Sequence, residues 1–457
     1  MRVAVVGLGK LGAPLAAVLA SKGHDVLGID VSDRVVELVN EGVAPVDEPE
    51  LQDLVSANRE RLRATTDLAA AADADVSVVL VPTPSDDSGA FSNAHVLAAT
   101  DRIGKALARH SAYHLVVVAS TVMPGTCQAE VLPLLEEASG RRVGETLGLC
   151  YSPEFIALGS VIRDMTTPDM VLIGESDPRA GEALERLYRT VCENDPPFRR
   201  MNLVNAELTK IAVNTYVTMK ISYANVLAEI CERLPEAHAD TITDALGLDS
   251  RIGSKYLRGA IAYGGPCFPR DNKAFSTFAR RLDVDPLLAE ATDSVNRRQV
   301  DRLARVVRSH LGEHDAVGIL GLAYKAGTGV AEESAGVALA RLLAESGYDV
   351  HVFDPLATSA AIATLDGLVH TCGSAEELLE RCDVAVIATP WPQFAELPIE
   401  RAERPGRRRV VVDCWGVLSD EMYGEAMNIV RLGHGPDTAS ALELVGGSDH
   451  GERRLTY

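Results

Sequence analysis

Residues 1–30 constrain the fold of this chain more than any other segment. A β-branched run at residues 2–6 leads directly into the pattern Gly-x-Gly-x-x-Gly at residues 7–12. An apolar helical pattern follows, and then a second strand-like run at 25–29 that ends in Asp30. In a dinucleotide-binding unit the first glycine allows the tight turn, the second lets the backbone approach the pyrophosphate, and the third permits close packing of helix on strand. A carboxylate at Asp30 accepts ribose hydroxyls and repels a 2′-phosphate, so the segment predicts an α/β domain that binds NAD rather than NADP.

Polar turns follow the next strand-like runs of this domain. Pro82 and Thr83 follow one run, Thr121 follows the next, and Glu154 comes after a third. Ligands of open α/β sheets bind at the carboxyl ends of the strands, so we expect these side chains beside the cofactor or the reacting centre. The alternatives are turn or cap roles for the threonines and an exposed loop position for the glutamate. Arg34 fits either the adenosine side of the cofactor or a solvated helix position. The predicted cofactor-binding residues are Gly7, Gly9, Lys10, Leu11, Gly12, Asp30, Arg34, Pro82, Thr83 and Thr121.

A second segment, which contains a candidate nucleophile, is the loop Gly264-Gly265-Pro266-Cys267-Phe268-Pro269-Arg270-Asp271. Its glycines let the backbone bend and approach a ligand closely, and its prolines fix the turn around a single cysteine. A thiol held in a rigid turn near a carboxylate, here Asp271, has the arrangement of an activated nucleophile. Because cysteine is also among the most buried residue types, a structural role for Cys267 is the alternative.

Residues 203–231 read as one long helix that is apolar over more than one stripe. Such a helix is buried between domains or in a dimer interface. Lys210 and Asn214 lie one turn apart and share a face, so they are either donors for a substrate oxygen or a snorkelling lysine and an interhelical hydrogen bond. Two or three further helices are expected up to residue 301, with the turn at 251–253 and the cysteine loop between them. Arg251 and Arg258 are either solvated cations or phosphate contacts, and the sequence alone favours the first.

A second strand-glycine-helix-strand pattern begins at residues 316–321 without the dinucleotide signature, and Lys325 beside it can neutralise a phosphate. We therefore predict an α/β protein with two doubly wound, Rossmann-like domains joined by a long central helix and a small helical domain. The last strand of the first domain is expected at 169–174. The predicted domains are an NAD-binding domain at 1–200, a helical, dimerising domain with the cysteine loop at 201–301, a C-terminal Rossmann-like domain at 302–445 and a polar tail at 446–457.

Composition limits the function classes. The net charge of the 457-residue chain is −21 and its acidic residues are scattered, which argues against a nucleic-acid-binding protein. The eight cysteines form no CxxC pair and no cluster with histidine, so neither a metal site nor a disulfide framework is expected. The N-terminus reads as a strand rather than a signal peptide, and no apolar run reaches the roughly 18 residues of a membrane span. We expect a soluble, cytoplasmic protein without membrane contact.

Eight motifs match one family in its own order and over nearly the whole chain. They are GLGKLG (7–12), VPTP (81–84), STVMPGT (120–126), SPEF (152–155), AELTKIAVNTY (206–216), DSRIG (249–253), GGPCFPRD (264–271) and GLAYKAGT (321–328). The chain thereby resembles the nucleotide-sugar 6-dehydrogenases of the UDP-glucose and GDP-mannose dehydrogenase superfamily. The resemblance implies an NAD-dependent enzyme that oxidises the C6 alcohol of a nucleotide-linked hexose to a carboxylate in two steps. It also implies that the C-terminal domain binds the nucleotide sugar.

The resemblance implies roles for the catalytic residues. Cys267 adds to the C6 aldehyde and carries the substrate as a thiohemiacetal and then as a thioester, which water hydrolyses. Asp271 acts as general base or orients this water, and Lys210 with Asn214 stabilises developing oxyanion charge. The implied catalytic residues are Cys267, Lys210, Asn214, Asp271, Thr121 and Glu154.

The resemblance also implies substrate contacts. Thr121 and Glu154 match positions that bracket the reacting carbon and water. Arg251 matches a position that reaches the substrate of a neighbouring subunit, which implies a homodimer or a higher homo-oligomer. The predicted substrate-binding residues are Glu154, Phe155, Lys210, Asn214, Arg251, Arg258, Tyr263, Gly264, Phe268 and Lys325.

Departures from the family pattern affect the nucleotide more than the reaction. Leu158 replaces a second glutamate, Pro266 and Arg270 alter the cysteine loop, and Glu332 and Trp415 stand where the family usually has arginines. UDP-glucose is the default substrate and TDP-glucose the main alternative, with GDP-mannose and a UDP-N-acetylhexosamine still open. From other classes, a one-step NAD-dependent hydroxyacid dehydrogenase needs no cysteine nucleophile. A nucleotide-sugar sensor needs no lysine, cysteine and aspartate together.

Overall fold

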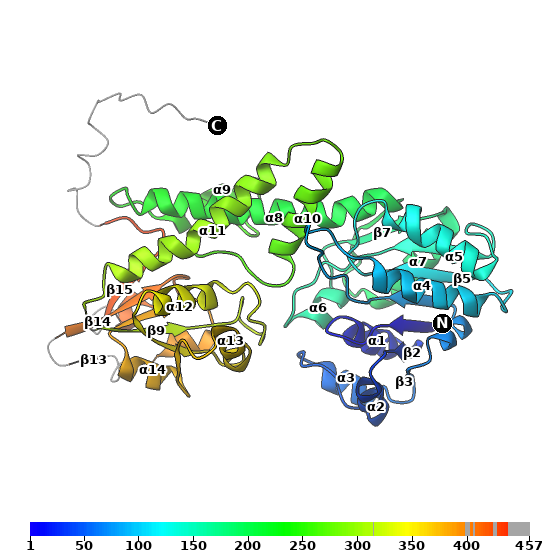
Figure 1. Cartoon of the computed structure of the whole chain (residues 1–457), viewed down its shortest axis with the longest axis horizontal. Coiled ribbons are helices and arrows are strands. Elements are labelled where there is room, and N and C mark those ends of the chain that lie inside the picture. The colour runs from blue at the N-terminus through cyan, green and yellow to red at the C-terminus, as the bar shows by residue number, and fades with distance from the viewer. Residues whose placement is uncertain (314, 398–402, 405–406, 424–426, 437–457) are drawn as a thin grey trace. The chain divides into compact units, whose positions relative to one another are not determined.

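The computed structural model describes residues 1–313, 315–397, 403–404, 407–423 and 427–436, which form two compact units (Figure 1). The first unit comprises Met1–Val213 and Lys273–Asp285, and the second comprises Asn214–Asn272 and the described residues from Pro286 onward. The boundary falls within two helices, α8 (Leu203–Cys231) and α10 (Phe268–Arg281). The predicted tail at 446–457 lies outside the described residues.

An eight-stranded sheet organises the first unit. All neighbouring pairs are parallel except β6 with β7. In spatial order the strands are β3 (Leu62–Thr65), β2 (Asp25–Ile29), β1 (Arg2–Val6), β4 (Val76–Val79), β5 (His114–Val118), β6 (Leu147–Tyr151), β7 (Val171–Glu175) and β8 (Phe198–Asn202). Strand β1 pairs with β2 on one side and β4 on the other, so it is an interior strand of the sheet. The glycine loop follows its carboxyl end.

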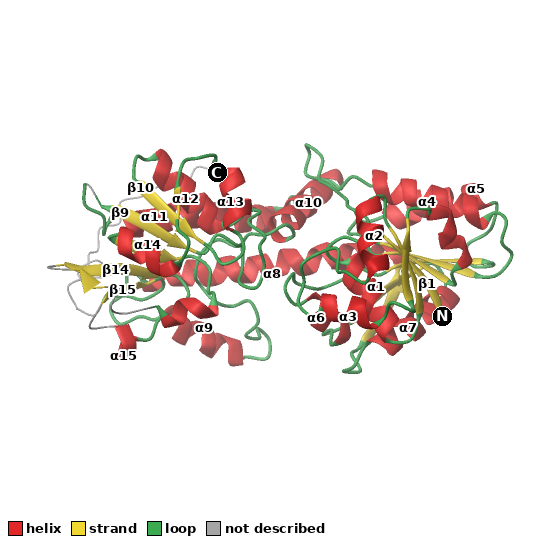
Figure 2. Ribbon diagram, turned by 90° about the horizontal axis from the view of Figure 1, so that it is seen from below, coloured by secondary structure: helices red, strands yellow, loops and turns green. Residues whose placement is uncertain are grey.

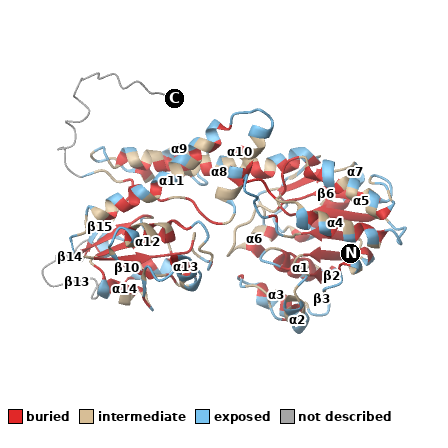
Figure 3. Ribbon diagram, viewed as in Figure 1, coloured by how far each residue is buried: buried red, intermediate tan, exposed pale blue. Residues whose placement is uncertain are grey.

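Helices cover both faces of this sheet, because its central strands are apolar on both sides. Val3 and Val5 of β1 pack on one face, and Ala4 and Val6 pack on the other. The first face is covered by α1 (Gly12–Ser21), α3 (Leu51–Ala57), α6 (Val161–Thr166) and α7 (Pro178–Val191). The second face is covered by η1 (Leu68–Asp73), α4 (Ala94–Leu107), η2 (Cys127–Val131), α5 (Leu132–Ser139) and the start of α8. Helix α2 (Asp33–Glu41) follows β2. The buried strands of the sheet are coloured red in Figure 3.

The prediction that the strand at 169–174 is the last of this domain was wrong. The structure has β7 at Val171–Glu175 and, after α7, a further strand β8 with the sequence Phe-Arg-Arg-Met-Asn. Strand β8 lies at one end of the sheet and is only partly buried, so it lacks the continuous apolar run of a central strand. The same reason applies to β3 at the opposite edge, which the sequence pattern also missed.

Helix α8 has the predicted bounds but an unexpected polarity. Its buried polar residues recur at one-turn spacing, whereas its large exposed residues are apolar. The buried set is Glu207, Lys210, Asn214, Thr218, Ser222 and Asn225, and the large exposed set on this helix is Val204, Leu208, Tyr216, Tyr223 and Ile230. We name the first set the polar stripe of α8.

The second unit contains a second, mainly parallel sheet, which confirms the predicted pair of doubly wound domains (Figure 2). Within the described residues its order is β11 (His370–Thr371), β10 (Asp349–Phe353), β9 (Ala316–Leu320), β12 (Val384–Ile387), β14 (Arg407–Asp413) and β13 (Glu403–Arg404), with β15 (Met427–Arg431) also paired to β14. The other elements of the unit are α9 (Ala239–Leu248), α11 (Leu287–Arg308), α12 (Ala335–Glu345), α13 (Thr358–Leu365), α14 (Ala375–Arg381), η3 (Pro392–Glu396) and α15 (Asp420–Tyr423).

Candidate active site

The glycine loop of the first unit has the geometry that a dinucleotide requires. Gly7 has φ +97°, and a Cβ on Gly12 would lie 1.8 Å from the carbonyl oxygen of Gly7. A Cβ on Gly9 would meet no described protein atom within 4 Å, so the backbone is approachable there. Helix α1 begins at Gly12 without a side-chain cap; its Ala13 N–H donates to the carbonyl of Gly9 at 3.1 Å and Pro14 has no N–H. The N–H of Gly12 and the positive end of the helix dipole are left for a pyrophosphate. The residues present therefore fit NAD.

Asp30 is oriented by the backbone. Its Oδ2 accepts the N–H of Leu8 at 2.8 Å and its Oδ1 accepts the N–H of Ser32 at 3.0 Å. A carboxylate offers about four acceptor positions, so two stay available for ribose hydroxyls. Arg34 is exposed, and its guanidinium lies 3.9 Å from Glu37, so its position also suits a solvated helix residue. The cofactor role of Arg34 stays a prediction.

Thr83 and Thr121, predicted at the ends of neighbouring strands, are brought together. The hydroxyl of Thr83 donates to the carbonyl of Thr121 at 2.7 Å, and the hydroxyl of the adjacent Ser120 accepts the N–H of Val81 at 2.9 Å. These bonds tie the turn after β4 to the turn after β5. The bond of the Thr83 hydroxyl has the turn-stabilising character that the sequence left open as an alternative.

Two buried glutamates that the sequence reading missed hold the loops of the first unit. Glu207 of α8 is fully buried and accepts the N–H groups of Gly125 (2.5 Å) and Cys127 (2.7 Å). Burial raises the pKa of this carboxyl. Glu48 accepts the N–H groups of Gly159 (2.9 Å) and Val161 (2.8 Å) in the same way. The first glutamate fixes the turn that carries Thr121, and the second fixes the loop after Glu154. Glu207 is one of two glutamates in α8, and no local sequence signal distinguishes it from Glu229.

Glu154, Phe155 and Lys210 form one group in the first unit. The buried Lys210 ammonium donates to the carbonyl of Glu154 at 2.6 Å and lies 4.7 Å from the centroid of the Phe155 ring. Among the described residues the buried Oε1 of Glu154 has no hydrogen-bond partner. Burial raises the pKa of Glu154 to about 7, against the opposing effects of Lys210 and of a hydrogen bond from Tyr188. The carboxyl can therefore hold or release a proton near neutral pH.

Replacing Glu154 with glutamine is expected to change the pH dependence of stability. The folded protein binds the Glu154 proton more tightly than the unfolded chain does, because the pKa rises from 4.5 to about 7. This contribution is fully present below pH 4.5 and is lost as the pH rises through 7. Relative to the wild type, the glutamine variant should gain about 1–3 kcal/mol between pH 5 and pH 8. Thermal unfolding at both pH values measures this, with the exposed Glu137→Gln as control. A difference from wild type that does not change with pH would contradict the assignment.

In the second unit the cysteine loop packs against residues 324–334. The N–H of Gly265 donates to the carbonyl of Glu332 at 3.0 Å. A Cβ on Gly264 would lie 2.0 Å from the carbonyl oxygen of Glu333, so no larger residue fits there. The same packing places the loop that carries Lys325 beside the cysteine loop. Gly264 thus has a packing role in addition to its predicted substrate contact.

Cys267 is exposed and directly precedes helix α10. Its carbonyl accepts the N–H of Asp271 at 2.8 Å in the first turn. The buried Oδ2 of Asp271 accepts the side-chain amide of Asn214 at 2.7 Å, and Nε of Arg270 lies 3.4 Å from Oδ1. Three predicted residues, Cys267, Asp271 and Asn214, are therefore brought together in this unit. Arg270, a departure from the family pattern, places a cation beside the catalytic carboxylate candidate.

The two predicted arginines have different surroundings. Arg251 is exposed and forms a bidentate pair with Asp249, with contacts of 3.0 and 2.6 Å. Lys220 of α8 holds this turn by donating to the carbonyls of Ile252, Gly253 and Lys255. Arg258 donates to the carbonyl of Trp415, one of the departing positions. The predicted phosphate roles of both arginines stay predictions.

Tyr263 and Phe268 lie at the two sides of the cysteine. Their ring centroids are 6.3 Å apart in an edge-to-face arrangement. Tyr263 is buried and its hydroxyl donates to Asp293 at 2.9 Å, so this hydroxyl has an internal partner. The sequence reading assigned Tyr263 to the substrate and did not anticipate this bond.

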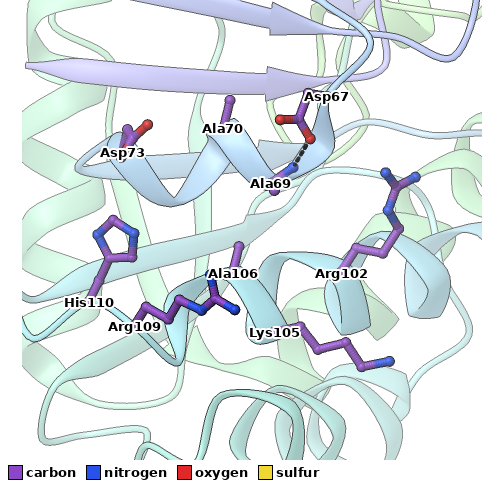
Figure 4. Close-up of a pocket in the computed structure, with 9 residues that line it drawn as sticks. All are labelled: Asp67, Ala69, Ala70, Asp73, Arg102, Lys105, Ala106, Arg109 and His110. Atoms are coloured by element: carbon purple, nitrogen blue, oxygen red, sulfur yellow. Dashed lines mark hydrogen bonds between the residues drawn. The ribbon is translucent and has the colours of Figure 1, made fainter.

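The pocket drawn in Figure 4 lies away from these residues in the first unit. It is lined by η1 and the C-terminal half of α4, including Asp67, Arg102 and Arg109. These elements lead into β4 and β5, so the pocket lies at the amino ends of strands whose carboxyl ends carry Thr83 and Thr121. Asp67 accepts the N–H of Ala69 at 3.0 Å there. The pocket contains none of the predicted site residues, and we assign it no part in the reaction.

The described part of the chain contains no group of three or more histidine, cysteine, aspartate or glutamate residues that could hold a metal ion. Among its helices, none combines the length and the apolar composition that a bilayer crossing requires.

Three family models match successive parts of the chain. They are the NAD-binding, central and UDP-binding domains of the UDP-glucose/GDP-mannose dehydrogenase family, at residues 1–192, 204–298 and 318–420. The chain belongs to this family. It is therefore an NAD-dependent nucleotide-sugar 6-dehydrogenase, which confirms the predicted cofactor and enzyme class.

Individual relatives of this dehydrogenase differ in substrate. It is 36% identical to UDP-glucose 6-dehydrogenase AglM of Haloferax volcanii over 417 residues, covering 90% of this chain and 96% of that protein. It is 37% identical to GDP-mannose 6-dehydrogenase of Pseudomonas aeruginosa over 360 residues, covering 78% and 81%. A UDP-glucose dehydrogenase structure from Pyrobaculum islandicum matches with a TM-score of 0.85 at 33% identity, covering 94% and 96% of the two chains. The family is thus established, whereas the sugar and the nucleotide are left open.

Proposed function

We propose that the enzyme oxidises the C6 hydroxymethyl group of a nucleotide-linked glucose, UDP-glucose or TDP-glucose, to the corresponding glucuronate. The observation that carries the four-electron reaction is the exposed Cys267 beside the buried Asp271–Asn214 pair. The similarity to AglM over most of both chains supports glucose as the sugar. GDP-mannose is the second candidate, because a GDP-mannose dehydrogenase is similarly identical over a shorter stretch.

The reaction balances with two oxidations and one hydrolysis. The C6 alcohol first loses a proton and a hydride to give the aldehyde. Sγ of Cys267 then adds to C6 as the C=O π bond opens and the carbonyl oxygen takes up the thiol proton, which gives a thiohemiacetal. The thiohemiacetal loses a second proton and a second hydride to give a thioester. Water breaks the C–S bond, which releases the carboxylate and restores the thiol. NAD⁺, when bound at the glycine loop, accepts the hydride in each oxidation.

The surroundings of the residues support their proposed roles. Lys210 is a buried cation, and Asn214 follows one turn later on the same helix, so both can donate to an oxyanion at C6. Asp271 is held by Asn214 and can take a proton from the hydrolytic water. A pKa of about 7 allows Glu154 to exchange protons at the working pH. Thr121 lies in the turn that Glu207 fixes.

We also propose a homodimer built on α8. The large exposed residues Tyr216, Tyr223 and Ile230 recur every two turns and form an apolar stripe on this helix. An exposed, preordered Arg251 supports a contact with the substrate of a neighbouring subunit. Arg258 and Lys325 are the proposed basic contacts for the diphosphate.

The test counts NADH formed per sugar consumed with UDP-glucose, TDP-glucose and GDP-mannose in parallel. We expect two NADH per sugar and a kcat/KM for one of the glucose substrates that is at least about tenfold higher than for GDP-mannose. A better kcat/KM with GDP-mannose would replace the sugar in the proposal. One NADH per substrate would instead favour the one-step dehydrogenase and remove the thioester.

A further inference from the structure

Both ends of the cysteine loop are tied to helix α11. Tyr263, the residue directly before the motif at 264–271, donates its hydroxyl to Oδ1 of Asp293 at 2.9 Å. Asn272, the residue directly after the motif, donates its amide to the same oxygen at 2.7 Å. A single carboxylate oxygen therefore binds the residues at both ends of the segment that contains Cys267 and Asp271.

The two anchor residues are themselves fixed. Asn296, one turn after Asp293, accepts the N–H of Tyr263 at 2.8 Å and donates to its carbonyl at 3.0 Å. The amide of the fully buried Asn272 also donates to the carbonyl of Ala289 at 2.9 Å, one turn before Asp293. Three successive turns of α11 thus hold Tyr263 and Asn272, the residues at the ends of the loop.

The hydroxyl of Tyr263 stays a hydrogen-bond donor at neutral pH. Burial and the neighbouring Asp293 carboxylate raise the pKa of Tyr263, so its hydroxyl keeps the proton that it donates.

From this geometry we infer that Asp293 is a positioning residue for the Cys267 nucleophile. Asp293 acts through Tyr263 and Asn272 and needs no contact with substrate. Its role rests on the proposed function, because capture of the aldehyde requires Sγ to lie within bonding reach of C6 when the first oxidation ends. A loop that has lost the Asp293 bond at each end would place Sγ less accurately and capture the aldehyde late, so part of the aldehyde would dissociate.

The test uses the full-length Asp293→Ala variant with the sugar nucleotide that the wild type prefers. We expect kcat to fall by about 10- to 100-fold with a smaller change in KM, because a misplacement of the nucleophile by about 1 Å lowers the rate by this much. We also expect NADH per sugar to fall from two toward one, with the escaped aldehyde trapped by a hydrazine reagent. Asp293→Asn retains one acceptor oxygen and should recover part of both values. The exposed Asp301→Ala on the same helix is the matched control.

The outcomes separate this inference from the proposed function. A wild type that fails to form two NADH per sugar removes the proposed function itself. A wild type that forms two, with a folded Asp293→Ala that also forms two at a kcat within twofold, overturns the positioning role even if its melting temperature is lower. If Asp293→Ala does not fold, Asp293→Asn and Asn272→Ala carry the test, and unchanged stoichiometry in both overturns the inference.

Discussion

Replacing Cys267 with alanine is expected to lower the rate of uronate formation by about 10³-fold or more. Without Sγ the aldehyde forms no thiohemiacetal, so the second oxidation lacks its covalent substrate. NADH per sugar should fall from two to no more than one, with aldehyde as the product of any residual turnover. NADH absorbance together with mass spectrometry of the sugar nucleotide measures both quantities.

Two controls make this result specific to the thiol of the cysteine loop. Cys372→Ala removes another thiol of the second unit and should leave the stoichiometry at two. Binding of NAD⁺ by the Cys267→Ala protein should match the wild type, because the glycine loop belongs to the first unit. Formation of two NADH per sugar by the alanine variant would eliminate the thioester route.

Alanine substitutions at Gly12 and Gly9 are expected to have opposite effects on folding and on cofactor binding. The new methyl group at Gly12 would lie 1.8 Å from the carbonyl oxygen of Gly7, so the strand and helix α1 must separate. We expect a loss of stability of about 3 kcal/mol or more, at the upper end for overpacked sites. The methyl group at Gly9 would meet no described atom within 4 Å, so this variant should unfold at the wild-type temperature.

The Gly9 variant should nevertheless lose NAD⁺ affinity by at least about tenfold, because its methyl group occupies the space through which the pyrophosphate approaches the backbone. Thermal unfolding and calorimetric titration with NAD⁺ measure the two properties on the same samples. Wild-type affinity in Gly9→Ala, or wild-type stability in Gly12→Ala, would contradict the division of roles between these glycines.

The parts of the fold that were predictable are those whose local pattern agrees with their surroundings. The strand-loop-helix start and the bounds of α8 follow from apolar runs and from the glycines and prolines that end them. Strands β3 and β8 were missed because edge strands are exposed on part of their surface and carry polar residues. Their pairing depends on neighbours far away in the sequence, which no local pattern records.

The candidate site divides in the same way. The types of the chemically active residues and their places at strand ends were visible, and the structure groups Cys267 with Asp271 and Lys210 with Glu154. The residues that hold these groups were not visible. Glu207 and Asp293 act on backbone or side chains distant in sequence, and nothing in their local context distinguishes them from ordinary helix carboxylates.

The polar stripe of α8 has a consequence for the order in which a ribosome-bound chain can mature. Glu207 and Lys210 find their partners, Gly125 and Glu154, in segments that are synthesised earlier. Asn214 and Ser222 need Asp271 and Thr292, which leave the ribosome later. The start of the helix can therefore complete its hydrogen bonds during translation, whereas Asn214 and Ser222 lack their folded-state partners until the cysteine loop and α11 have been made. The two parts of α8 therefore gain their hydrogen-bond partners at different stages of synthesis.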